Sequence, residues 1–99
     1  MELLPEEIRK NSFIFRFVKR GERAIMYEQY DPEFDSTIAW EVFKRKIDKP
    51  KIVFGIQLNE REIFPGNEDF GKWAWSIRNL EKANTIFNDI EENKLDSEL

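Results

Sequence analysis

The spacing of apolar residues changes once along this 99-residue chain, and that change limits the folds the chain can adopt. From residue 12 onward, aromatic and β-branched residues recur at every second position, which is typical of strands. From residue 80 the spacing becomes helical, with a stripe formed by Leu80, Ala83, Phe87 and Ile90. Runs of strands followed by one helix are typical of the α+β class. We therefore predict an antiparallel sheet of four or five strands, arranged as a meander, with a C-terminal α-helix packed on one face.

Turn-forming residues divide the strand region into five segments. We predict strands over residues 12–19, 23–30, 37–46, 51–58 and 72–78. The first two form a hairpin that turns around Gly21, and Gly55 predicts a bulge inside the fourth segment. In the last segment Trp73, Trp75 and Ile77 would share one face of the sheet. Residues 59–71 are expected to be irregular.

The two ends of the chain carry their own signals. Pro5, Glu6 and Glu7 suit the first turn of a helix, so residues 2–10 are expected to form one helical turn. Asn79 is a suitable N-cap for the C-terminal helix. We expect one domain over residues 1–99, with an ordered core of about residues 12–92 and an acidic tail over residues 93–99.

Composition excludes several kinds of active site. The chain has neither cysteine nor histidine, which removes a disulfide framework, a thiolate metal site and the commonest general base. The serines consequently have no histidine partner for nucleophilic catalysis. With 40% hydrophobic and 14% aromatic residues, the chain has enough apolar surface to fold. We predict a folded protein that is not an enzyme and needs no cofactor.

One stretch approaches the pattern of a phosphate-binding loop. Residues 66–73 read GNEDFGKW, but Trp73 occupies the position where that pattern requires Ser or Thr. Glu68 and Asp69 would also place two carboxylates against the phosphates, and a strand rather than a helix follows. These departures exclude nucleotide binding. A calcium site at Asn67, Glu68 and Asp69 is an alternative, although the spacing is not that of an EF-hand.

The aromatic residues of the first strand admit two interpretations. Phe13, Phe15 and Phe17 lie at period two, so they share one face of the strand. Such a face stacks bases in RNA-recognition domains, but the βαββαβ order of those domains is missing here. Burial of the three residues in the core is the favoured interpretation.

Basic residues gather around two predicted turns, which we call the basic end. In a meander both turns lie at the same end of the sheet, while many acidic residues, including Glu60 and Glu62, fall at the other end as solvated loop acids. An end rich in Lys and Arg can bind phosphates or an acidic protein. Simple collection of charges in turns and head-to-tail association of the two ends are the alternatives. The candidate residues are Lys19, Arg20, Arg23, Lys44, Arg45, Lys46, Lys49 and Lys51.

Three segments together resemble small uncharacterised proteins of bacterial and phage type. They read EVF at residues 41–43, FPGNEDFGKWAW at residues 64–75 and LEKA at residues 80–83, and the resemblance covers residues 38–92. It implies a unit of β-sheet plus helix and an origin in a phage or mobile element. It implies no activity, cofactor or catalytic residue.

These observations favour a small non-catalytic module whose partner is another protein. The alternative is a nucleic-acid-associated protein that uses the basic end, with an affinity that falls as salt rises. No apolar run reaches the roughly 18 residues of a membrane span, and the first ten residues are acidic rather than signal-like. We therefore expect no membrane partner, and we expect a cytoplasmic location.

Overall fold

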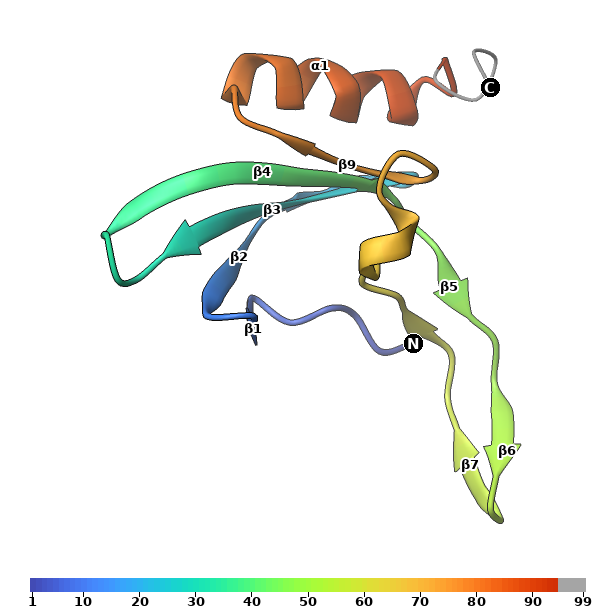
Figure 1. Cartoon of the computed structure of the whole chain (residues 1–99). Helices are drawn as coiled ribbons and strands as arrows, with labels where there is room; N and C mark the ends of the chain where they lie inside the picture. The colour runs from blue at the N-terminus through green and yellow to red at the C-terminus, as the bar shows by residue number, and fades with distance from the viewer. Residues whose placement is uncertain (95–99) are drawn as a thin grey trace.

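The centre of the molecule is a five-stranded antiparallel sheet with strand order β1-β2-β3-β4-β9 (Figure 1). A computed structural model describes residues 1–94, so residues 95–99 of the predicted acidic tail lie outside the described residues. The strands are β1 (Glu7–Lys10), β2 (Phe13–Arg20), β3 (Ala24–Asp31), β4 (Ser36–Lys44) and β9 (Ala74–Ile77). The C-terminal helix α1 (Leu80–Glu91) contacts β3, β4 and β9. The predicted α+β class, with an antiparallel sheet and a C-terminal helix on one face, is confirmed.

The prediction of a helical turn over residues 2–10 is wrong, because residues 7–10 form β1 instead. Asn11 and Ser12 adopt positive φ values of 54° and 69°, the backbone conformation of a tight hairpin turn. This turn folds the preceding residues back onto β2, with Lys10 opposite Phe13. Pairing with a neighbouring strand satisfies backbone groups that a single helical turn would leave without partners.

The fourth predicted strand, residues 51–58, does not join the sheet. It folds on itself as a hairpin of β6 (Lys51–Val53) and β7 (Ile56–Leu58), and Gly55 lies in the turn rather than in a bulge. Figure 1 shows this hairpin projecting from the body of the molecule. At its root β5 (Ile47–Asp48) pairs with β8 (Arg61–Glu62). We call residues 47–62 the arm.

Helix α1 covers one face of the sheet. Its N-cap is Asn79, as predicted, and the side-chain oxygen of Asn79 accepts a hydrogen bond from the Lys82 backbone N–H at 2.9 Å. The buried residues of this layer are Ala83, Phe87 and Ile90 of α1 and Ala24, Met26 and Val42 of the sheet. Trp75 and Ile77 pack against the same cluster. Three residues of the predicted stripe, Ala83, Phe87 and Ile90, therefore form the face that α1 buries, whereas Leu80 is 43% exposed.

The opposite face of the sheet holds a second, aromatic core. The Phe64 ring lies 5.3–5.4 Å from the rings of Phe15, Tyr27 and Phe43. Phe13 and Phe17 pack against this cluster, so the interpretation of the β2 phenylalanines as core residues is confirmed. The segment that carries Phe64 also includes the 3₁₀ helix η1 (Asn67–Asp69).

Trp73 packs on this aromatic face, and the expectation that it shares a face with Trp75 is wrong. The reason is that β9 begins only at Ala74. Trp73 therefore lies outside the ladder and does not follow its alternation.

Candidate functional site

A bulge in β2 determines which face of the sheet Lys19 and Arg20 each occupy. The register of β2 against β3 shifts between Phe17 and Lys19, and the extra residue reverses which face each following side chain occupies. Lys19 therefore lies beside α1, where its Nζ donates to Oδ1 of Asn84 at 2.7 Å and lies 4.3 Å from the Phe87 ring. Arg20 turns to the opposite face of the sheet. Lys19 is thus engaged in the packing of α1.

Arg20 and Arg45 meet at the buried carboxylate of Glu62, which is 4% exposed. Arg20 donates from Nη2 to Oε1 at 2.7 Å and from Nε to Oε2 at 2.8 Å, and Arg45 donates from Nε to Oε2 at 2.6 Å. The backbone N–H of Leu4 adds a bond to Oε1 at 2.8 Å. Burial would raise the pKa of Glu62, but the hydrogen bonds from the two arginines and Leu4 outweigh it and lower the pKa to about 2. Two cations of the basic end therefore share one carboxylate, which offsets one of their two charges.

The expectation that Glu62 is a solvated acid at the opposite end of the sheet is wrong. The arm leaves the sheet after β4 and returns at β8, so it brings Glu62 back to the end where Arg20 and Arg45 lie. The prediction differs because a strand over residues 51–58 that crosses the sheet would leave Glu62 at the other end.

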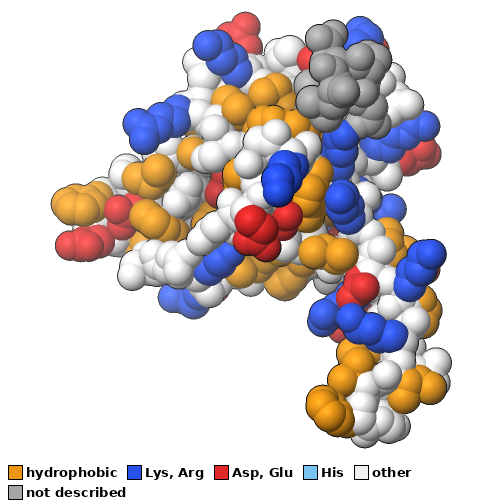
Figure 2. Space-filling view, turned by 45° about the vertical axis from the view of Figure 1, so that its right-hand side comes forward, with side chains coloured by type: hydrophobic (Ala, Val, Ile, Leu, Met, Phe, Trp, Pro, Cys, Tyr) orange, Lys and Arg blue, Asp and Glu red, His pale blue; other side chains and the backbone are white. Residues whose placement is uncertain are grey.

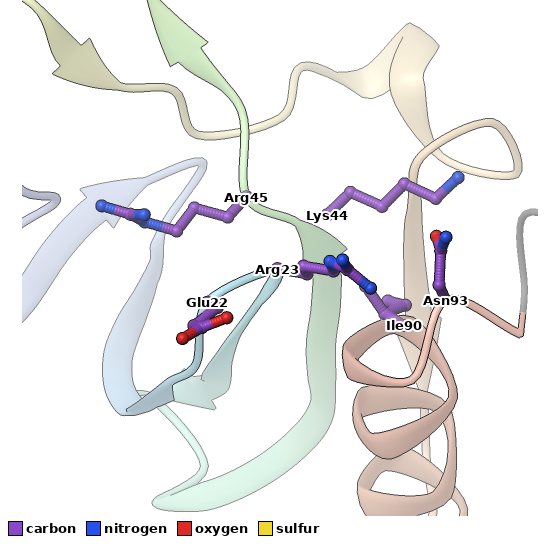
Figure 3. A pocket seen from close by; sticks show the side chains of 6 residues that line it. All are labelled: Glu22, Arg23, Lys44, Arg45, Ile90 and Asn93. Atoms are coloured by element: carbon purple, nitrogen blue, oxygen red, sulfur yellow. The ribbon is translucent and has the colours of Figure 1, made fainter.

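Arg23, Lys44 and Arg45 line a shallow hollow of about 280 Å³ beside the C-terminal end of α1, together with Glu22, Ile90 and Asn93 (Figure 3). Their side chains do not converge. Figure 3 shows Lys44 and Arg45 pointing to opposite sides of the chain, whereas Arg23 points toward Ile90. Successive residues of an extended chain diverge in this way, so the hollow is not a cradle formed by three cations.

The other three residues of the basic end belong to the arm or its root. Lys46 Nζ lies 4.7 Å from the Trp73 ring, and Lys51 Nζ lies 3.3 Å from a carboxylate oxygen of Asp48. Lys49 is exposed between them. The eight predicted residues are therefore distributed over both faces of the sheet, the hollow and the arm.

The tip of the arm is an exposed apolar surface. Phe54 is 99% exposed, Ile52 is 71% exposed and Ile56 is 64% exposed, with Val53 between them. Figure 2 shows hydrophobic side chains at the end of the arm, away from the body. We call residues 52–56 the tip. Scattered exposed apolar residues are ordinary, but a contiguous group on a projecting element is a candidate binding surface.

The backbone of the tip is unfavourable for the residue it carries. Phe54 and Gly55 have φ values of 51° and 79°, as in the two-residue turns that favour Asn-Gly. A bulky residue seldom adopts positive φ, at a cost of roughly 1–2 kcal/mol. Phe54 recovers none of this cost by packing within the described residues, since it is almost wholly exposed. Such a residue is a candidate for function rather than for stability.

The root of the arm, by contrast, is fastened to the body. Glu2 forms a parallel bridge with Arg61 beside the β5–β8 pair. The Glu62 N–H donates to the Glu2 carbonyl at 2.9 Å, and the Ile63 N–H donates to the Lys46 carbonyl at 3.0 Å. Together with the ion pairs of Glu62, these bonds hold the root while the tip extends into solvent.

Two other carboxylates have local structural explanations. Asp69 of the loop considered for calcium accepts a hydrogen bond from the Gly66 N–H at 2.8 Å, which closes the start of η1. Glu41 is buried opposite Tyr27 and Ser76, and its Oε2 has no hydrogen-bond partner within residues 1–94. Burial raises the pKa of Glu41, while a hydrogen bond from Ser76 and the charge of Lys10 partly offset the rise.

The described part of the chain contains no group of three or more side chains arranged to hold a metal ion. It also contains no helix that is both long and apolar enough to cross a membrane. Comparison with known proteins finds no family model, no curated protein and no solved structure that matches the chain. The tip of the arm is therefore the feature on which a functional proposal can be built.

Proposed function

We propose that this chain is a small non-catalytic protein-binding module and that the tip of the arm is its binding element. The observation that carries the proposal is the position of Phe54, which is 99% exposed at the end of a hairpin with a fastened root. Exposed aromatic residues surrounded by apolar neighbours are the usual energetic anchors of protein interfaces.

The tip has the chemistry of an anchor that enters a pocket on another protein. Its apolar residues are contiguous, and polar or charged residues such as Lys51 and Gln57 flank them. Burial of one large apolar side chain contributes roughly 1.5–3 kcal/mol. Burial of the four apolar tip residues together contributes roughly 6–12 kcal/mol, which supports a complex no tighter than about 1 µM after the cost of association is subtracted.

Nucleic-acid binding at the basic end has weaker support. Arg20 and Arg45 already neutralise Glu62, and Lys19 is engaged with α1. Phosphate recognition requires several cations that face one backbone, whereas those lining the hollow point in different directions. We therefore prefer the protein partner.

Affinity capture with matched variants tests the proposal. The full chain is immobilised and exposed to an extract of its source cells, in parallel with Phe54→Asp and with Phe34→Asp. Phe34 is a suitable control because it is also highly exposed, at 73%, but lies between β3 and β4 rather than on the arm. We expect a protein that the original chain and Phe34→Asp retain and Phe54→Asp loses. Equal retention by all three chains would overturn the proposal.

A further inference from the structure

We infer that β7 is a docking edge for a second copy of this chain, so that two arms pair antiparallel into a four-stranded sheet of order β6-β7-β7-β6. The inference rests on the proposed function, because it names a partner for the same arm. A two-stranded ribbon is only marginally stable alone in water, and a second ribbon on its open edge would complete it.

The outer edge of β7 is open. Among residues 1–94, β7 pairs only with β6. In a hairpin closed by a two-residue turn, the residues next to the turn bond to each other, and the following residues point their backbone groups outward. Val53 and Ile56 are the pair next to the turn, so the N–H and C=O of Gln57 face away from β6. An unpaired edge of this kind is a template for another strand.

The sequence of β7 is complementary to itself. Ile56, Gln57 and Leu58 carry no charge, so two copies can approach without like-charge repulsion along the strand. A two-fold axis at Gln57 places each Gln57 opposite its counterpart, where the two residues exchange both backbone hydrogen bonds. Ile56 of one copy then lies opposite Leu58 of the other. Because the same edge is used on both sides, the assembly closes at two copies.

The other edge of the ribbon, formed by β6, is protected against the addition of another strand. Residue 50, which precedes β6, is a proline and has no N–H to donate to a neighbouring strand. Lys51 adds a charge next to it. Proline and lysine on an edge strand are the usual means of preventing strand addition. The ribbon thus has one blocked edge and one open edge, and the open edge is uncharged.

The contact would be small. It involves one three-residue strand and its flanks from each copy, which is less than the roughly 800 Å² per partner of a standard interface. We therefore expect a dissociation constant on the order of 10–100 µM. Each copy carries a net charge of -4, so salt should strengthen the dimer by screening repulsion between the two bodies.

Sedimentation equilibrium of the full chain tests the inference, from about 5 µM to about 1 mM so that the expected dissociation constant is bracketed. The original chain should show a monomer–dimer equilibrium. Gln57→Lys places two like charges directly opposite each other and should weaken the dimer by up to about fivefold. Ile52→Lys is the comparison on the other edge of the ribbon, because Ile52 is the register partner of Gln57 on β6. It removes apolar surface from the tip but places no charge opposite its counterpart, so it should weaken the dimer less than Gln57→Lys does. Phe34→Lys, at an exposed position outside the arm, is the control that should leave the affinity unchanged.

A mixing experiment identifies residue 57 as the point where the copies meet. Gln57→Lys and Gln57→Glu should each dimerise more weakly alone than they associate when mixed, because opposite charges then face each other. A variant that had merely unfolded the arm would not be restored by mixing. Circular dichroism of each variant checks that the body is folded.

Several results would overturn the inference. A chain that stays monomeric at every concentration would overturn it. The proposed function would still stand in that case if capture of a different protein continued to depend on Phe54. Loss of the dimer in Ile52→Lys but not in Gln57→Lys would assign the contact to β6. Equal loss in both variants would indicate face packing instead of edge pairing. Species larger than a dimer that dissociate in salt would indicate head-to-tail contact between oppositely charged surfaces.

Discussion

The Arg20 guanidinium of β2 donates two hydrogen bonds to the carboxylate of Glu62, which follows it by 42 residues at the root of the arm. Planar pairing of this kind is stronger and more directional than a single hydrogen bond. It fastens the arm to the sheet at a buried position, and Arg45 completes the cluster. The root of the arm is therefore part of the fold, whereas the tip makes no comparable contact with the rest of residues 1–94.

Replacing Glu62 by glutamine should destabilise the whole domain. Glu62→Gln keeps the shape of the side chain but leaves Arg20 and Arg45 without their counter-charge, at positions largely removed from water. Removal of one partner from a buried ion pair typically costs about 3–5 kcal/mol. We expect about 2–4 kcal/mol here, since both arginines retain some access to solvent. Urea unfolding measures the change. Glu33→Gln, at an exposed loop position, serves as the control and should change little.

Acid should destabilise the protein through the same residue. The pKa of Glu62 in the folded state is about 2, compared with an ordinary value of 4.5, so its contribution is complete above about pH 4.5 and is lost as the pH falls toward 2. The shift corresponds to roughly 3 kcal/mol. We expect the difference in free energy of unfolding between the original chain and Glu62→Gln to shrink over this interval. A difference in free energy of unfolding that does not change with pH would contradict the lowered pKa of Glu62.

Glu41 should have the opposite pH dependence. Its pKa is raised by burial, so its contribution to stability is present below its ordinary pKa and is lost as the pH rises through the folded-state pKa. Glu41→Gln removes the buried charge and should be more stable than the original chain at neutral pH, by about 1 kcal/mol. Unfolding at a series of pH values should show this advantage vanish near pH 4.5. A variant that is less stable at neutral pH would show that the Ser76 hydrogen bond and the Lys10 charge outweigh the cost of burying Glu41.

The turn at the tip should become more stable when Phe54 is replaced by asparagine. Asn tolerates positive φ and is favoured before glycine in such turns, so Phe54→Asn should stabilise the hairpin by about 0.5–1 kcal/mol. Hydrogen exchange at the β6 and β7 amides should slow by about two- to fivefold. Partner capture should nevertheless be lost, because the aromatic anchor is gone. Slower hydrogen exchange with unchanged partner capture would show that Phe54 does not take part in binding.

Gly21, in the turn between β2 and β3, leaves room for the side chain of Glu91 at the end of α1. A Cβ at this position would lie 1.4 Å from Oε1 of Glu91, whose Oε2 accepts the Arg23 N–H at 2.8 Å. Gly21→Ala should displace the Glu91 side chain and cost about 1 kcal/mol through the lost hydrogen bond. The cost should fall in a Glu91→Ala background, where there is nothing to displace. An equal cost in both backgrounds would mean that the turn itself is strained.

The layered fold was predictable because local patterns decided it. Alternation identified β2, β3, β4 and β9, and helical spacing with an N-cap at Asn79 identified α1. The arm was not predictable in the same way. Four residues of Lys51–Leu58 favour strands, namely Ile52, Val53, Phe54 and Ile56. Its turn requires positive φ at a phenylalanine, which local preference disfavours. The prediction of a continuous strand followed from that preference.

The candidate site depended on contacts between distant residues. The position of Glu62 between Arg20 and Arg45 results from the path of the arm, and the face that Lys19 occupies results from one bulge in β2. Neither can be obtained from spacing alone. A signal for the tip was nevertheless present: a Phe-Gly pair between two apolar runs, in a segment flanked by Pro50 and Asn59.

Photo-cross-linking inside the source cells tests the central claim most directly. A photoreactive phenylalanine analogue replaces Phe54 in one chain and Phe34 in another, both highly exposed but on different elements. We predict a discrete protein adduct at position 54, either with a second copy of the chain or with another protein, and no matching adduct at position 34. The same adducts at both positions, or none at position 54, would contradict the claim that the tip of the arm is a protein-binding element.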